Sequence, residues 1–134
     1  MRQLSLWMET LKKQGDILIV SDDTSEREFL QFLLEKKGHD CFVTENINEA
    51  LSYLQHDKVD LFICKEKLFL HSDRGELEKI EQEMDKVTVL MLALNGCIYW
   101  SRDGRPTFYK SVDYFIQTPV GVPELSRALE EIFG

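Results

Sequence analysis

The chain has 134 residues, of which 43% are hydrophobic and 30% are charged. This length and composition predict one globular domain with its own core, and they exclude wholesale disorder and a coiled-coil rod. Acidic residues outnumber basic ones by 24 to 16, which gives a formal net charge of −8. A chain this acidic is a poor match for nucleic acid or for an anionic membrane surface, because both would repel it.

The cysteines and the apolar runs both favour a cytoplasmic location. Cys41, Cys64 and Cys97 are odd in number and form no C-x-x-C pair, which argues against a disulfide framework and for a reducing environment. Cys41 and Cys64 lie within apolar runs, so we expect them to pack in the core. The longest apolar run, at 89–94, is too short to span a bilayer, and no signal peptide precedes it. We therefore expect a cytoplasmic protein.

The N-terminal residues differ in pattern from the rest. Residues 4–13 carry apolar side chains at helical spacing and predict a short amphipathic leader helix, with Gly15 as its stop. We therefore divide the chain into a leader helix at 1–15 and a domain at 16–134. Within that domain, short apolar runs predict five strands, and the first of them is typical of a strand buried on both faces of a parallel sheet. The runs are 17–20, 41–44, 61–64, 87–92 and 114–116.

Helical patterns fill the intervals between these runs. Ser25 and Glu28 form a capping-box pattern, and Gly38 stops the helix that follows. Asn46 is typical of the cap of the next helix, and Pro123 of the first turn of the last one. The apolar positions of the four helices are Phe29, Phe32 and Leu33; Ile47, Ala50, Leu51 and Leu54; Leu77, Ile80 and Met84; and Leu125, Ala128, Leu129 and Ile132.

This alternation of strands and helices predicts an α/β fold with a doubly wound, five-stranded parallel sheet of order 2-1-3-4-5. In such a fold the functional site lies at the carboxyl ends of the strands. The residues that follow the strand ends are therefore the candidates. They are Ser21, Asp22 and Asp23 after the first strand, Lys65, Glu66 and Lys67 after the third, Ala93 after the fourth, and Thr118 after the fifth.

Five segments within residues 16–133 carry a resemblance through their order and spacing; they are ILIVSDD (17–23), NINEALSYL (46–54), VDLFIC (59–64), VTVLML (87–92) and TPVGVPEL (118–125). Together they resemble the receiver domain of bacterial response regulators. The resemblance implies a two-component signalling domain in which an aspartate ending strand 3 accepts a phosphoryl group. It also implies an acidic pair that helps to hold Mg²⁺, a Ser/Thr after strand 4, and a Lys after strand 5.

Nearly every one of these positions departs from the family pattern. The acidic pair falls on Ser21 and Asp22, the acceptor on Lys65, the Ser/Thr on Ala93 and the Lys on Thr118. Lys65 removes a carboxylate and adds a cation where the metal and the phosphoryl group should meet. We therefore expect a pseudo-receiver without aspartyl phosphorylation, metal, cofactor or enzymatic activity.

Two alternatives stay open at this site. Either the Lys65 ammonium takes the Mg²⁺ position and pairs with Asp22 or Asp23, or the side chain points to solvent. A second question is whether another carboxylate accepts the phosphoryl group. Glu66 would face inward if the strand register slipped by one residue, and Asp22 or Asp23 is a further candidate.

The segment 95–113 does not read as the helix that a receiver carries between strands 4 and 5. Asn95–Gly96 is a turn signal, and Asp103–Gly104 is a hairpin signal. Aromatic and arginine side chains of the kind enriched at interface hot spots gather here, and in the family this surface docks dimers and targets. We therefore predict an interaction surface; the alternative is that some aromatics cover the sheet. Its residues are Tyr99, Trp100, Arg102, Arg105, Phe108, Tyr109 and Phe115, the last at the family's aromatic switch position.

The expected function is phosphorylation-independent regulation through a protein partner, as the input of a response regulator or transcriptional regulator, or as a stand-alone adaptor. A homodimer is a family-level expectation, and DNA binding would lie in a separate output domain. A small-ligand sensor, with 95–113 covering a pocket, is the other alternative. Three acidic residues at 22–26 speak against a flavin phosphate there. His39, His56 and His71 show no metal-ligand spacing, and we expect them to be exposed.

Overall fold

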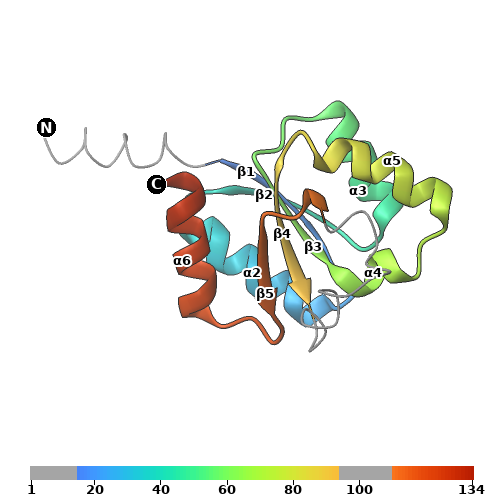
Figure 1. Cartoon of the computed structure of the whole chain (residues 1–134). Coiled ribbons are helices and arrows are strands. Elements are labelled where there is room, and N and C mark those ends of the chain that lie inside the picture. The colour runs from blue at the N-terminus through green and yellow to red at the C-terminus, as the bar shows by residue number, and fades with distance from the viewer. Residues whose placement is uncertain (1–14, 94–109) are drawn as a thin grey trace, which may run out of the picture.

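The computed structural model describes residues 15–93 and 110–134. Its centre is a five-stranded sheet in which every neighbouring pair is parallel (Figure 1). The order β2-β1-β3-β4-β5 confirms the predicted α/β topology. The strands are β1 (Asp16–Val20), β2 (Asp40–Thr44), β3 (Leu61–Lys65), β4 (Thr88–Ala93) and β5 (Tyr114–Gln117).

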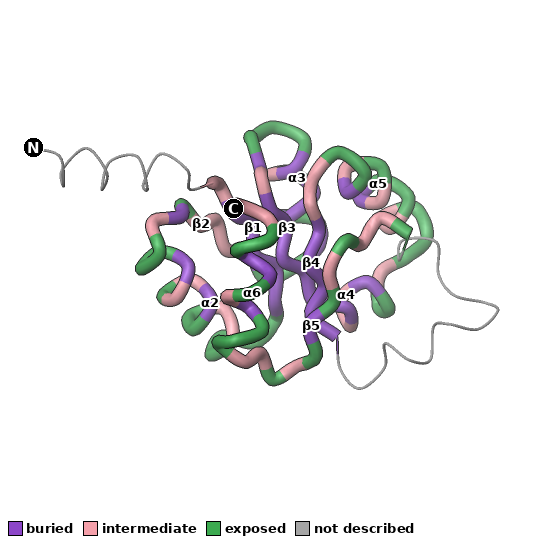
Figure 2. The backbone as a smooth tube through the Cα atoms, turned by 60° about the vertical axis from the view of Figure 1, so that its left-hand side comes forward, coloured by how far each residue is buried: buried purple, intermediate pink, exposed green. Residues whose placement is uncertain are grey.

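Helices cover both faces of this sheet (Figure 1). Apolar residues of α2 and α6 pack on one face, and those of α3, α4 and α5 pack on the other. The three central strands, β1, β3 and β4, are buried along most of their length (Figure 2). The edge strands β2 and β5 each bury one residue and are otherwise partly exposed. The helices are α2 (Thr24–Lys36), α3 (Ile47–His56), α4 (Glu66–Leu70), α5 (Arg74–Met84) and α6 (Val122–Phe133).

Strand β1 shows why the strand sequences are apolar without alternation. Ile17 and Ile19 enter the core under α2 and α6, whereas Leu18 and Val20 enter the core under α3, α4 and α5. All four side chains are fully buried. Successive side chains of a strand point to opposite faces, so a strand covered on both sides must be apolar at every position.

The helix ends follow local chemistry, with one departure from the expected pattern. Helix α2 begins at Thr24, and Asp23 caps it by accepting the Glu26 N–H at 3.1 Å. The capping box expected at Ser25 is therefore wrong: Asp23 has the stronger carboxylate acceptor and lies just beyond the end of β1. Asn46 caps α3 as expected, with its Oδ1 2.9 Å from the Glu49 nitrogen.

A short helix was missing from the expected pattern. Helix α4 follows β3 without a loop, and Lys65 stands at its N-cap. Phe69 of this helix is fully buried and belongs to the core under α3 and α5. A single helical turn has too few residues to show a 3.6-residue period, so periodicity does not reveal it.

Two expectations about exposure are wrong. His39 is only 5% exposed, because its Nδ1 accepts the Gly15 N–H at 3.2 Å and its ring packs 4.7 Å from that of Phe133. Phe29 and Phe32 follow the helical apolar pattern, yet they are 38% and 67% exposed. His56 and His71 are exposed, as expected.

Several expected features lie outside the described residues. These are the leader helix up to residue 14, the segment 94–109 with its turn and hairpin signals, and Cys97. Asp113, which follows this segment, is bound to the sheet: its nitrogen donates to the Val89 carbonyl at 2.9 Å, and its carboxylate accepts the Val89 N–H at 2.8 Å. Within 15–93 and 110–134, no helix is long and apolar enough to cross a membrane.

Candidate functional site

The strand register brings the predicted site residues to one edge of the sheet. Val20 pairs with Cys64, Lys65 with Leu92, and Ala93 with Gln117. The residues that follow these positions therefore meet at the carboxyl ends of the strands.

Lys65 is the central charged side chain of this edge. Its Nζ atom lies 3.3 Å from Oε1 of Glu26 and 3.8 Å from Oδ1 of Asp22. The side chain is 11% exposed, so it does not point to solvent. Of the two arrangements left open by the sequence, the described geometry is the ion pair with Asp22, extended by Glu26.

A second lysine completes the charge balance. Lys67 Nζ lies 3.0 Å from the other carboxylate oxygen of Asp22, so this one carboxylate faces two ammonium groups. The hydrogen bond from Lys67, together with the positive charges of both lysines, lowers the pKa of Asp22 below its ordinary 3.8, although partial burial opposes the shift. Asp22 is therefore ionised at neutral pH and saturated by cations.

Ser21 holds Glu26 in place from the β1 side. Its hydroxyl donates to Glu26 Oε1 at 2.7 Å and accepts the Asp23 N–H at 3.2 Å. Arg27 donates from Nη1 to the Ser21 carbonyl at 2.6 Å and from Nη2 to Glu45 at 3.3 Å. Hydrogen bonds from the Ser21 and Arg27 side chains therefore stabilise the turn from β1 into α2.

Asp23 has a different role from its neighbour. Its carboxylate caps α2 through the Glu26 N–H. Asp22 and Glu26, rather than Asp22 and Asp23, are the carboxylates that meet Lys65. No sequence pattern marks Glu26 as this partner, since the contact depends on where α2 begins.

The remaining predicted site positions lie on β4 and just after β5. The Thr118 nitrogen donates to the Ala93 carbonyl at 2.9 Å, and the Thr118 hydroxyl lies 3.4 Å from the same oxygen. The structure therefore brings these two positions together. At this edge of the sheet Ala93 presents a methyl group, and the Thr118 hydroxyl is directed at a backbone carbonyl.

Glu66 stands beside this cluster in the chain. The register of β3 against β4 places Lys65 as the last strand residue, without the one-residue slip that would have exchanged the two. Glu66 is the first residue of α4 and is 4% exposed. Its burial shields the carboxylate from bulk solvent.

The donor set does not suit Mg²⁺. This ion prefers a near-octahedral shell of oxygens, usually with carboxylates. The Asp22 and Glu26 carboxylates are bridged by the Lys65 ammonium, which would have to move before a cation could enter. Over the described ranges, no group of three or more His, Cys, Asp or Glu side chains is arranged to hold a metal.

The described cysteines are not candidate nucleophiles. Burial raises the pKa of the Cys41 thiol to about 12 and that of Cys64 well above its ordinary value. Cys64 is fully buried and lies 3.9 Å from the Leu90 carbonyl, whereas Cys41 is only partly buried. A thiol reacts as its thiolate, so the raised pKa of each side chain disfavours its reactive form.

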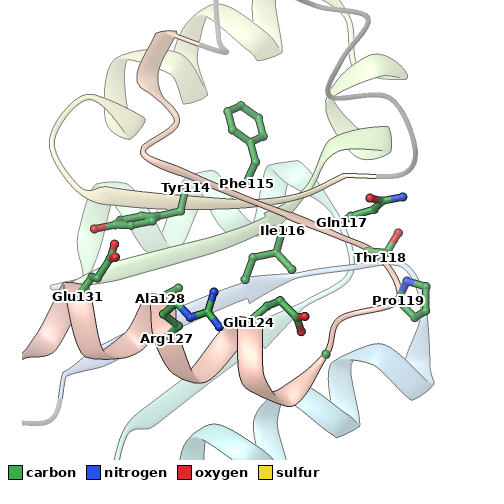
Figure 3. A pocket seen from close by; sticks show the side chains of 11 residues that line it. Tyr114, Phe115, Ile116, Gln117, Thr118, Pro119, Glu124, Arg127, Ala128 and Glu131 are labelled. Carbon is green, nitrogen blue, oxygen red and sulfur yellow. The ribbon is translucent and has the colours of Figure 1, made fainter.

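A groove lies between β5 and α6, with a volume of about 660 Å³ (Figure 3). Ile116 points toward α6, whereas Phe115 points to the opposite side of β5 and is 37% exposed. Arg127 and two glutamates of α6, Glu124 and Glu131, supply charge along the groove. Of the predicted interaction surface, Phe115 lies in the described part of the chain. Tyr99, Trp100, Arg102, Arg105, Phe108 and Tyr109 lie outside it.

A known protein is similar to this chain in sequence. No family model matches the chain. An uncharacterised 14.6 kDa protein of Leptolyngbya boryana is 29% identical over 124 residues, which cover 92% of this chain and 93% of that protein.

Solved structures of receiver domains superpose over most of the chain. The Francisella response regulator 1452 receiver domain has a TM-score of 0.69 at 21% identity, covering 88% of this chain and 95% of that chain. A CheY-like receiver domain of Methylobacillus flagellatus has a TM-score of 0.69 at 18% identity, covering 89% of this chain and 98% of that chain. The receiver domain of Saccharomyces cerevisiae Ssk1 was solved together with the histidine phosphotransfer protein Ypd1. It has a TM-score of 0.72 at 18% identity, covering 90% of this chain and 89% of that chain. The chain therefore has the fold of a CheY-like response-regulator receiver domain.

Proposed function

We propose that this chain is a phosphorylation-independent signalling domain, a pseudo-receiver that acts through contact with a protein partner. The observation that carries the proposal is the Lys65 ammonium, held between Asp22 and Glu26 at the end of β3. In the receiver fold this is the position of the phosphoryl acceptor.

The chemistry of the site argues against phosphoryl transfer to residue 65. An ammonium paired with two carboxylates has no lone pair available to attack phosphorus. The neighbouring Asp22 carboxylate is itself bound by Lys65 and Lys67. Negative charge that would hold Mg²⁺ in a receiver is here neutralised by the protein's own lysines.

The same ion pairs favour one fixed conformation. Lys65 ends β3, whereas Asp22 follows β1 and Glu26 belongs to the first turn of α2. The pairs therefore join two segments far apart in the sequence, without a modification that could be added or removed. Regulation then depends on the amount of the protein and on its partner, rather than on a phosphoryl group.

We place the partner contact at the groove between β5 and α6, which Phe115 borders. Its occupant is a protein, and the contact serves as the regulatory input of a response regulator or transcriptional regulator. The yeast structure pairs a receiver domain with a histidine phosphotransfer protein, which makes that class of protein the first partner to assay.

Phosphorylation is tested with Mg²⁺ and acetyl phosphate, followed by intact-mass measurement and peptide mapping. We expect no phosphoryl adduct on the wild type. The control variant K65D puts a carboxylate at the end of β3, and a gain of labelling there would show that the assay detects this site. An adduct on Glu66, Asp22 or Asp23 of the wild type would overturn the proposal and favour an atypical receiver.

The partner contact is tested separately, with a photo-crosslinking amino acid at position 127, because the exposed Arg127 lines the groove. Lys79 is the matched control position, because it is also an exposed basic residue on a helix but belongs to α5. We expect a purified phosphotransfer protein, or another candidate regulator, to cross-link at 127 and not at 79. Equal yields at the two positions for every candidate would contradict the placement at this groove.

A further inference from the structure

Helix α2 carries an apolar patch on its outward side. The helix buries Leu30 and Leu34 against the sheet, whereas Phe32 is 67% exposed and Phe29 is 38% exposed. The helix lies on the outside of the molecule, with much of its length exposed (Figure 2). Neighbouring phenylalanines exposed on one helix face are typical of an interaction site rather than of a solvated surface.

Opposite charges stand on either side of this patch. Glu28 lies four residues before Phe32, and Lys36 lies four residues after it. The Lys36 ammonium sits over the Phe32 ring, 5.8 Å from its centroid. Among the ion pairs of residues 15–93 and 110–134, none involves Glu28 or Lys36. Eight residues of helix separate them by about 12 Å, so they cannot pair within one chain.

We propose that this face of α2 is an interface between two copies of the chain. Two α2 helices pack antiparallel across a two-fold axis near Phe32. The Phe29 and Phe32 rings of both copies fill the centre, and Glu28 of each copy pairs with Lys36 of the other. This surface is distinct from the β5–α6 groove and does not depend on the function proposed above.

The spacing of the charges favours a second copy over an unrelated partner. A two-fold contact brings the same patch of both molecules together, so residues at equal distances on either side of the axis face each other. Glu28 and Lys36 stand at equal distances from Phe32 and have opposite signs. The patch is therefore complementary to itself.

The size of the patch sets the expected affinity. Stable complexes bury about 1,200–2,000 Å² in total, and one face of a 13-residue helix offers less than this. We therefore expect a weak, reversible dimer, with a Kd between about 10 µM and 1 mM.

Sedimentation velocity of the full chain over this concentration range tests the inference. The wild type should shift from monomer toward dimer. The variant F32D should stay monomeric, because it places a like-charged carboxylate of each copy at the axis. The control L70D changes another exposed apolar residue, which lies on α4, and should dimerise as the wild type does.

Charge reversal identifies the occupant. E28K and K36E each place like charges across the axis and should weaken the dimer by about 5-fold. The double variant E28K/K36E restores opposite signs and should return to within about 2-fold of the wild type. A wild type that stays monomeric throughout this concentration range would overturn the inference. A double variant no tighter than either single one would overturn it as well.

Discussion

The Nζ atom of Lys65 lies 3.3 Å from Oε1 of Glu26, in the first turn of α2. The same carboxylate oxygen accepts the Ser21 hydroxyl at 2.7 Å. This contact joins the end of β3 to the start of α2. Both charged side chains are nearly buried, with 11% of Lys65 and 12% of Glu26 exposed. This contact is the structural basis for our proposal that the Lys65 ammonium takes the place of a bound metal ion.

Replacing Glu26 by glutamine should destabilise the fold. The amide of E26Q keeps a hydrogen-bond acceptor for Ser21, but Lys65 then has only the Asp22 carboxylate, 3.8 Å away, to balance its charge. A nearly buried charge that loses one partner lowers stability, and we expect a loss of about 1–3 kcal/mol. Urea denaturation measures it. E78Q, on the exposed side of α5, is the control and should change stability by less than about 0.5 kcal/mol.

Asp22 should contribute to the acid sensitivity of the fold. The Lys67 hydrogen bond holds the pKa of Asp22 below its ordinary 3.8, so the unfolded chain binds this proton more readily than the folded chain does. The stabilisation is therefore present above about pH 4 and is lost as the pH falls through the lower, folded pKa. The Tm should fall less in D22N than in the wild type between pH 7 and pH 3. A D22N profile that overlays the wild type would contradict this, and D57N is the exposed control.

His39 should affect stability at a higher pH. Burial lowers its pKa below the ordinary 6.5, and the nearby Lys37 charge acts in the same direction. Its Nδ1 also accepts the Gly15 N–H and must therefore be unprotonated. A folded pKa below the unfolded one means that stability is present above about pH 6.5 and declines as the pH drops.

Thermal unfolding between pH 7.5 and pH 5 checks this expectation. H39Q offers a side-chain oxygen to Gly15 without a titrating group, so its Tm should depend less on pH in this range. H71Q is the control, because His71 is exposed. Equal slopes for H39Q and the wild type would show that His39 titrates alike in both states.

Two glycines should respond oppositely to alanine. A Cβ at Gly15 would lie 2.6 Å from Cε1 of Phe133 and 2.9 Å from Oδ2 of Asp60, so G15A should destabilise by about 1–3 kcal/mol. Gly75 lies in α5, and its nearest such atom is Asp73 Oδ1 at 3.5 Å. There G75A should stabilise by about 0.5–1 kcal/mol, because alanine favours the helix. Urea denaturation of both variants checks the pair, and a neutral G15A would contradict the close approach.

The order of the strands could be predicted from the sequence because the strands and helix ends each have a local sequence pattern. Strand residues such as 17–20 are apolar at every position, as burial on both faces requires. Asn46 and Gly38 mark helix ends through their own chemistry: one accepts a backbone N–H, and the other adopts a φ of 97°. The receiver topology then follows from alternation and handedness.

The partners within the site could not be predicted, because they depend on packing between distant segments. Glu26 reaches Lys65 only because Asp23, and not Ser25, caps α2. His39 is buried because the end of α6 brings Phe133 against it. The apolar pattern of α2 also does not distinguish Leu30, which is buried, from Phe32, which is exposed.

The central claim is that Lys65 occupies the place of a metal and that no phosphoryl switch operates. An amide NMR titration of the wild type with Mg²⁺ and then beryllofluoride, a stable mimic of the phosphoryl group, tests it most directly. We predict no saturable shift at residues 20–24, 64–67 and 93. K65D should bind Mg²⁺ in the same experiment. Saturable shifts of the wild type at those residues would contradict the account and show that a carboxylate site still binds the metal.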